Sequence, residues 1–322
     1  MLHDAVHTHR FNEPQDLQAA HPGVEFQIVP MGRGPFAVEV TTMELGDISL
    51  NVGHASPFMG FAKVTPDCAV VQLPRENLGT LLLNGVACQP GVVGVYAGGA
   101  ELLRANPQPS SFASLILPFA SMERFLEPPP QSKLLSPGRY VLLQAEPDTR
   151  ARYERVVLAA HEAALSVPDL FKLEQSRLAL REALVHAARD LINPDHASET
   201  RMPRNGQALR RIVVAADEYL RLHMDRPIYT EDLCDALAVS ASSLADAFRA
   251  AFMISPHRFL KLRRMSMVRA ALQSREGPVP LVKSVALGHG FWHLGQFAHD
   301  YRETFGEAPS ETLERAHGRP AA

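Results

Sequence analysis

The C-terminal third of this 322-residue chain contains an internal repeat. Residues 248–256 recur as residues 301–309, with an aromatic residue, an arginine, a phenylalanine and a proline at matching positions 53 residues apart. Self-similarity of this kind indicates one supersecondary unit used twice. Further upstream the offset is 52, so one residue is inserted in the second copy; there Leu233, Cys234 and Val239 match Val285, Ala286 and Phe291.

Each copy has the pattern of two helices joined by a tight turn. In the first copy we expect Thr230 to cap a helix over residues 231–237, and Ser240 to cap a second helix that ends at Phe252. In the second copy we expect helices over residues 281–289 and about 293–305, with Gly290 in the turn, where a left-handed conformation costs glycine little. This pattern is typical of the helix-turn-helix, whose second helix enters the major groove of DNA.

The segment between the copies, residues 257–273, predicts a connecting helix from its apolar spacing. At ~1.5 Å per residue such a helix spans roughly 25 Å, which suits two recognition helices in major grooves about 34 Å apart. The alternative, a six-helix domain without a nucleic-acid role, does not explain the repeat. The segment also carries five cations that could contact phosphates, namely Arg258, Lys261, Arg263, Arg264 and Arg269.

The charge distribution favours the same interpretation. The net charge is −3, but residues 1–200 hold 15 Lys and Arg against 22 Asp and Glu, whereas residues 201–322 hold 17 against 13. A basic C-terminal part beside an acidic N-terminal part is a modest indication of nucleic-acid binding. An uneven distribution of solvated surface charge is the alternative.

The repeat carries a recognisable signature. Residues 284–291, Ser-Val-Ala-Leu-Gly-His-Gly-Phe, are followed by Phe297, Tyr301-Arg302, Phe305-Gly306 and Ala308-Pro309. This pattern resembles the AraC/XylS-type bacterial transcription regulators over about residues 208–315. The resemblance implies a cytoplasmic, sequence-specific regulator that binds double-stranded DNA, dimerises through its N-terminal domain and often activates transcription through RNA polymerase.

The resemblance also assigns candidate DNA contacts. Base contacts are expected from the outward face of the second helix in each copy, and that of the second copy should carry most of the discrimination because Gln296 can pair with adenine in a bidentate way. Asp246 departs from the family, in which this position is more often polar or basic; it could read cytosine, be neutral or pair with Arg249. The base-reading candidates are Ser242, Ala245, Asp246, Trp292, His293, Gly295, Gln296 and His299. The phosphate candidates are Arg249, Arg258, Lys261 and Arg302, of which Arg249 and Arg302 could instead form intramolecular ion pairs.

The N-terminal part predicts an antiparallel β domain, because short strands alternate with Gly, Pro and Asn turns. Strands are expected over residues 24–29, 36–43, 48–53, 69–73, 80–86, 92–96 and 114–117. From about Arg150 the period becomes helical, and a hairpin broken at Pro168 is expected to dimerise the protein through its leucines or to pack within one chain. The pattern and position of the strands resemble the cupin-like sensing domain of the family.

The fold class is therefore α+β multidomain, with a cupin-like domain and hairpin followed by an all-α tandem helix-turn-helix domain. We expect a polar leader over residues 1–23, a sensing and dimerisation domain over 24–192, a linker over 193–207, a DNA-binding domain over 208–315 and a tail over 316–322. No apolar run reaches the ~18 residues of a membrane span, and Cys68, Cys88 and Cys234 have no zinc spacing. The start of the chain does not have the pattern of a signal peptide.

The competing interpretation is a cupin-type metal-dependent enzyme fused to a helical domain. It requires a cluster of metal ligands, whereas His54 is the one histidine between Gly23 and Glu127, and the His7-Thr8-His9 pair precedes the strands. We therefore expect no catalytic role, no cofactor and no metal, and instead a small-molecule effector of unknown identity. Five aromatic residues could line its pocket or belong to the core: Phe36, Phe58, Phe61, Phe112 and Phe119.

Overall fold

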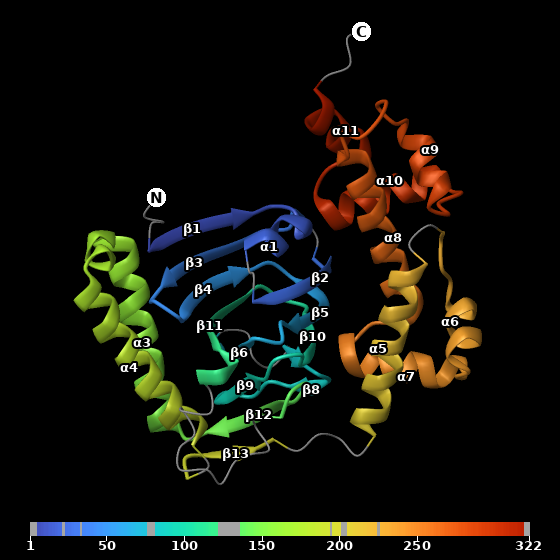
Figure 1. Ribbon diagram of the computed structural model, residues 1–322. Coiled ribbons are helices and arrows are strands. Elements are labelled where there is room, and N and C mark those ends of the chain that lie inside the picture. Colours follow the sequence, from blue (N-terminus) through green and yellow to red (C-terminus); the bar gives the residue numbers. More distant parts are fainter. Residues whose placement is uncertain are drawn as a thin grey trace.

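The computed structural model places a strand domain between two helical layers (Figure 1). A helical hairpin covers one side of the strands, and the first helices of the C-terminal part cover the other, while its last helices extend beyond the strands. The structure describes residues 5–20, 23–32, 34–75, 81–121, 136–193, 195–200, 205–223 and 226–318.

The strand domain consists of two antiparallel sheets that face each other. Among the described residues, the larger sheet has eight strands in the order β1-β3-β4-β11-β6-β9-β12-β13, and the smaller has five in the order β2-β5-β10-β7-β8. The strands are β1 (Val6–Phe11), β2 (Val24–Pro30), β3 (Val38–Glu44), β4 (Ser49–Ala55), β5 (Phe58–Val64), β6 (Cys68–Pro74), β7 (Leu82–Leu83), β8 (Val86–Ala87), β9 (Val92–Tyr96), β10 (Glu101–Asn106), β11 (Ser110–Pro118), β12 (Tyr140–Ala145) and β13 (Ala197–Glu199).

The antiparallel β domain is confirmed, but several strands differ from the prediction. The single strand expected over residues 80–86 is the short hairpin β7–β8, because Asn84 and Gly85 both have positive φ, 50° and 76°, and form its turn. Strands β5, β10 and β12 were not predicted. Residue 80 lies outside the described residues.

The segment expected to be a polar leader, residues 1–23, contributes two elements. Strand β1 pairs with β3 at the edge of the larger sheet, with His7 opposite Thr42, and helix α1 (Pro14–Ala20) follows it. No residue of this strand is buried, which is why its sequence resembles a polar leader, yet its backbone completes the ladder beside β3. The expected linker, residues 193–207, likewise contains β13, which pairs with β12.

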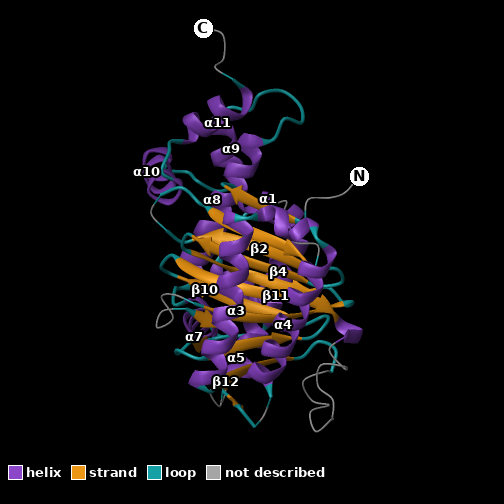
Figure 2. Ribbon diagram, turned by 90° about the vertical axis from the view of Figure 1, so that its left-hand side faces the viewer, coloured by secondary structure: helices purple, strands orange, loops and turns teal. Residues whose placement is uncertain are grey.

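The predicted helical hairpin is formed by α3 (Pro147–Ser166) and α4 (Glu174–Ile192), with a 3-10 turn at Pro168–Lys172 between them. Figure 2 shows the hairpin crossing the face of the larger sheet. Its inward face, including Tyr153, Val157, Leu184 and Leu191, joins a core with side chains of that sheet. The hairpin therefore packs within the chain, which is one of the two roles considered for it; dimerisation is the other.

The C-terminal part is entirely helical where it is described, and its predicted helices are confirmed to within one or two residues. Thr230 is the first residue of its helix rather than the cap; the preceding Tyr229 takes the cap position, and its backbone N–H donates to Asp232 at 2.7 Å. The helices are α5 (Gly206–Leu222), α6 (Thr230–Leu237), α7 (Ala241–Phe252), α8 (Pro256–Gln273), α9 (Val282–Gly288), α10 (Leu294–Phe305) and α11 (Pro309–His317). We call α6–α7 the first unit and α9–α10 the second unit.

Helices α7 and α8 pack against the smaller sheet. Phe61 of β5 meets Phe252 and Phe259 edge to face, with ring centroids 5.5 and 6.3 Å apart, and all three side chains are buried. Leu103 and Ala105 of β10 belong to the same apolar cluster. Full burial of one such side chain contributes about 1.5–3 kcal/mol, so this cluster holds the helices to the strands.

The two units match in backbone conformation as well as in sequence. Ala238 and Gly290 occupy equivalent places in the two turns, and both are left-handed, with φ of 51° and 77°. Met253 and Gly306 occupy equivalent places after the second helices, with φ of 60° and 76°. The first unit therefore holds non-glycine residues where the second has glycine.

This difference gives a stability prediction. Ala238→Gly should raise the free energy of unfolding by up to about 1 kcal/mol, because a left-handed alanine costs roughly 1–2 kcal/mol, less the entropy cost of glycine. Gly290→Ala should lower the free energy of unfolding by about 2 kcal/mol, since its Cβ would also lie 2.6 Å from Tyr229 Oη. Urea unfolding of the full chain would measure both. As a control, Ala298→Gly within α10 should lower the free energy of unfolding by about 1 kcal/mol. A decrease of similar size for Ala238→Gly would contradict the prediction.

Candidate nucleic-acid interface

The second helix of the first unit, α7, presents a small-residue face to solvent. Ser240 caps it, accepting a hydrogen bond from the Ser243 backbone N–H at 3.1 Å as predicted. Leu244, Phe248 and Phe252 are buried, so the opposite face is left outward. Ser242 and Asp246 are exposed and Ala245 is half-buried.

Asp246 forms an ion pair with Arg249, 3.1 Å apart, on this outward face. The two side chains are 60% and 66% exposed, so the pair adds little stability. Of the three roles considered for Asp246, the structure shows the ion pair. Part of the charge of Arg249 is therefore already offset within the chain.

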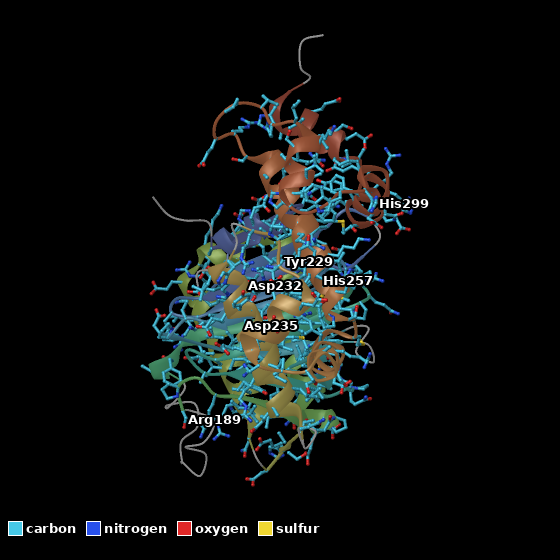
Figure 3. The ribbon with its side chains drawn as sticks, turned by 90° about the vertical axis from the view of Figure 1, so that its right-hand side faces the viewer. Arg189, Tyr229, Asp232, Asp235, His257 and His299 are labelled. Carbon is cyan, nitrogen blue, oxygen red and sulfur yellow. The ribbon has the colours of Figure 1, made fainter. Side chains whose placement is uncertain are left out.

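The second helix of the second unit, α10, presents longer and planar side chains. Phe297, Tyr301 and Phe305 form its buried stripe, and Gln296, Gly295 and His299 are exposed on the other face. Figure 3 shows this side of the molecule, with His299 above Tyr229 and the α6 residues Asp232 and Asp235. We call α7 and α10 the recognition helices; they lie at opposite ends of α8 (Figure 1).

Trp292 is the inserted residue of the repeat. The offset is 52 up to Phe291 and 53 from His293 onward, which leaves Trp292 as the extra residue immediately before the cap of α10. Its side chain is 71% exposed, an unusual place for a large aromatic group. His293 beside it is also exposed, so the entrance of α10 offers two planar groups to a partner.

Asp300 is a member of this surface that the sequence analysis missed. Its carboxylate accepts a hydrogen bond from Gln296 Nε2 at 3.1 Å and pairs with Lys261 of α8 at 2.5 Å. Lys261, a phosphate candidate, is thus tied to α10, and the Gln296 amide is oriented by its neighbour one turn along. The available signal was the Gln–Asp spacing of four residues, which places both on one helix face.

Three of the five cations expected to contact phosphates on the connecting helix face inward, which corrects that expectation. Arg263 donates to the buried Asp217 of α5 at 3.2 Å, and burial raises the pKa of this carboxyl despite its arginine partners Arg221 and Arg263. Arg264 is buried between the rings of Tyr229 and Phe291, 4.8 and 5.2 Å from their centroids, and so links the two units. These side chains turn inward because α8 is packed on most of its circumference.

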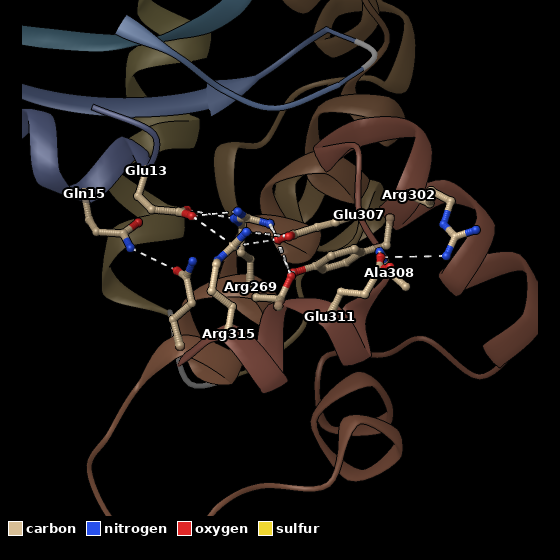
Figure 4. Close-up of polar contacts among 11 residues, drawn as sticks. Glu13, Gln15, Arg269, Arg302, Glu307, Ala308, Glu311 and Arg315 are labelled. Carbon is tan, nitrogen blue, oxygen red and sulfur yellow. Dashed lines mark hydrogen bonds and ion pairs between the residues drawn. The ribbon is translucent and has the colours of Figure 1, made fainter. Parts of the chain in front are cut away.

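Arg269 is the third inward cation, and it joins the two halves of the chain (Figure 4). Its Nε and Nη2 donate to the two carboxylate oxygens of Glu13 at 2.7 and 2.6 Å, and its Nη1 donates to Glu307 at 2.7 Å. Arg315 donates to the same Glu307 from the surface. Burial raises the pKa of Glu307, but hydrogen bonds from Thr312, Arg315 and Arg269 outweigh it, so the net shift is downward.

The remaining phosphate candidates are exposed. Arg258 at the start of α8 makes no ion pair with a described residue, and Arg302 lies 3.8 Å from Glu311 at the surface. Arg302 and Arg249 are therefore both in intramolecular ion pairs, the alternative considered for them, although both pairs are open to solvent. These exposed candidates lie on α7, on α10 and at the start of α8.

The described residues contain no group of three His, Cys, Asp or Glu side chains placed to hold a metal ion. His54 bonds Ser111 at 3.2 Å, and His7 and His9 lie on β1. No described helix is both long and apolar enough to cross a membrane.

Comparison with known proteins identifies this region. Residues 233–315 match a family model described as a helix-turn-helix domain. The chain is 35% identical over 98 residues to the XylDLEGF operon transcriptional activator 1 of Pseudomonas putida, covering 30% of each protein. It is 33% identical over 123 residues to a probable thc operon regulatory protein of Rhodococcus erythropolis, covering 38% of this chain and 37% of that protein. The match thus spans only about a third of these relatives.

Among solved structures, the chain is similar to the AraC-like transcriptional activator CuxR at 14% identity, with a TM-score of 0.42 over 82% of this chain and 94% of that one. It is also similar to fatty acid-bound ToxT from Vibrio cholerae at 11% identity, with a TM-score of 0.29 over 97% of this chain and 95% of that one.

The geometry and the match together define the class: the C-terminal part is a tandem helix-turn-helix domain. The relatives define this domain more narrowly: it is the helix-turn-helix domain of the AraC/XylS-type transcription regulators. The resemblance inferred from residues 284–309 is confirmed.

The Arg269 cluster gives a second stability prediction. Arg269→Met should lower the free energy of unfolding by about 3–5 kcal/mol, because it leaves two carboxylates without their buried partner. Arg315→Met is the matched control; it removes a 56% exposed arginine from the same Glu307 and should cost under about 1 kcal/mol. Urea unfolding would measure both. Because the pKa of Glu307 is lowered on folding, its contribution is complete at neutral pH and is lost as the pH falls through that lowered pKa. Equal costs for the two variants would contradict the prediction.

Proposed function

We propose that this protein is a sequence-specific DNA-binding transcription regulator. The observation that carries the proposal is the pair of exposed recognition helices held at the two ends of one 18-residue helix, α8. At ~1.5 Å per residue α8 is about 27 Å long, which suits two successive major grooves about 34 Å apart. The relatives are named as operon activators and regulators, which supports activation of transcription; this would require contact with RNA polymerase.

Within this proposal the two recognition helices have unequal roles. Gln296 and His299, with Trp292 and His293 at the entrance of α10, would read base edges. Ser242 and Asp246 on α7 are short or already paired, so they would discriminate less. Arg249, Arg258, Lys261 and Arg302 would contact phosphates and position the protein without reading sequence.

The DNA-binding test compares three variants of the full chain on a randomised-site library. Gln296→Ala should relax preference at one position of the site, by about 1–3 kcal/mol of discrimination. Arg302→Ala should weaken specific and non-specific DNA about equally and reduce the salt dependence of binding. Asp246→Ala should leave specificity unchanged, and it should tighten binding slightly because it frees Arg249.

Arg155→Ala, an exposed arginine of α3 on the far side of the strand domain, is the control and should change nothing. The ranking of the two helices is wrong if Asp246→Ala abolishes specificity while Gln296→Ala has no effect. A wild-type chain that binds no DNA at low salt would overturn the proposed function itself.

Dimerisation is the second part of the proposal, and the hairpin supports it. Its outward face leaves large apolar side chains in solvent, beside a depression lined by alanines such as Ala159 and Ala163. A second copy of the hairpin could place its leucines there and bury both surfaces around a two-fold axis. The exposed apolar residues are Leu158, Leu165, Val167, Leu170, Leu173 and Leu178, each 43–59% exposed.

The double variant Leu158→Glu, Leu165→Glu should convert a dimer into a monomer, because the two positions lie two turns apart on the same face of α3. Leu222→Glu is the control; this leucine of α5 is 75% exposed, more than either target, and lies outside the hairpin. Light scattering at roughly tens of micromolar would measure the mass, since specific dimers form in that range. A wild-type monomer under these conditions would count against the dimer.

An effector-binding role for the strand domain is the third part. A cavity lies between the two sheets and opens to solvent at its mouth. Of the five phenylalanines suggested from the sequence, Phe58, Phe61 and Phe112 line it, whereas Phe36 and Phe119 belong to the core. Small-molecule sites are cavities of this kind, apolar with a few polar groups.

A further inference from the structure

The cavity has one charged side chain among its described lining residues, Arg104. Successive residues of a strand face opposite sides, so on β10 Leu102 and Arg104 face the cavity while Leu103 and Ala105 pack against the C-terminal helices. The guanidinium carbon of Arg104 lies 5.3 and 5.6 Å from the rings of Phe58 and Phe112. The residue is only 7% exposed.

Arg104 has no carboxylate partner among the described residues. Its Nε donates to Asn106 at 3.4 Å and its Nη2 to Ser110 at 3.3 Å, both long bonds to neutral oxygens, and its Nη1 donates to no described residue. Burial lowers the pKa of Arg104 to about 10, so it remains a cation at neutral pH. Burial also raises the pKa of the nearby Cys88 thiol to about 12, so this group is neutral.

Two more polar groups in the cavity wall lack partners. The Gln72 Oε1 and Tyr96 Oη atoms are buried and make no hydrogen bond to a described residue. Each such group normally finds a partner when it is buried. Tyr96 can donate to an acceptor, and Gln72 can accept from a hydroxyl or amide. The cavity therefore combines a broad apolar wall, one uncompensated cation and two unsatisfied hydrogen-bonding groups.

We propose that this cavity binds an organic monocarboxylate with an apolar body, its carboxylate paired with Arg104. That this molecule acts as the effector of the regulator rests on the proposed function, whereas the binding site itself rests on the cavity alone. The guanidinium fork matches a carboxylate in geometry and offsets its charge. The aliphatic and aromatic side chains of the wall, including Phe26, Ile28 and Leu102, would contact the body.

Alternative ligand classes fit less well. An amine would add a second cation to a cavity in which no described side chain carries a negative charge. A sugar would bring several hydroxyl groups to a wall with few polar partners, and each unpaired group is costly to bury. A phosphate ester would bring more charge than one arginine offsets. The monocarboxylate satisfies Arg104 and leaves the rest of the ligand apolar.

The test measures binding of matched ligands to the full chain by calorimetry. The probes are straight-chain and phenyl-substituted monocarboxylates, each paired with its own primary amide, so that only the head-group charge changes. Wild type should bind at least one carboxylate about ten- to a hundredfold more tightly than its amide. Arg104→Gln should abolish this preference, and Arg104→Lys should keep part of it.

Arg210→Gln is the matched control and should leave the preference unchanged, since Arg210 pairs with Glu101 outside the cavity. The inference is overturned if no carboxylate exceeds its amide on wild type, a comparison that needs no variant to fold. It is also overturned if the preference survives in folded Arg104→Gln. DNA binding is measured on the same samples: DNA binding without carboxylate binding rejects this inference alone, and carboxylate binding without DNA binding rejects the proposed regulator alone.

Discussion

Helix α8 is packed by other parts of the chain over most of its surface, and its inward-facing arginines fix the position of both units. Arg263 ties it to α5 through Asp217, and Arg264 lies between an aromatic ring from each unit. Arg269 reaches the N-terminal segment through Glu13. Because a buried cation is costly without a partner, each of these contacts favours one arrangement of its neighbours. The spacing of the recognition helices therefore depends on α8.

The sequence predicted the two units because their signals are local. Caps, apolar spacing and the left-handed turn at Gly290 all lie within a few residues of the feature they specify. The roles of Arg263 and Arg269 could not be predicted in this way, since Asp217 and Glu13 lie 46 and 256 residues away in the chain. A cation on a predicted helix looks the same whether it faces DNA or a distant carboxylate. Which base-reading candidates contact DNA is still a prediction.

Two of the missed strands, β5 and β10, have partners on both faces. Strand β5 is buried at every position except Lys63, because one face lines the cavity and the other packs on the C-terminal helices. Such a strand lacks the alternation of a half-exposed strand. Strand β10 was missed for a related reason. An arginine at position 104 suggests a side chain that faces solvent, whereas the Arg104 side chain faces the cavity. The antiparallel domain was predictable from its turns, but the wall it shares with the helices was not.

That shared wall connects the two proposed activities. Phe61 lines the cavity and also contacts Phe252 and Phe259, the rings at the end of α7 and on α8. On the opposite side, Leu17 of α1 lines the cavity one helical turn from Glu13, the partner of Arg269. A molecule in the cavity would thus touch side chains that hold the helices at two separate places. Since a ligand shifts an equilibrium only by binding its states unequally, these two contacts are where occupancy of the cavity would alter the placement of the recognition helices.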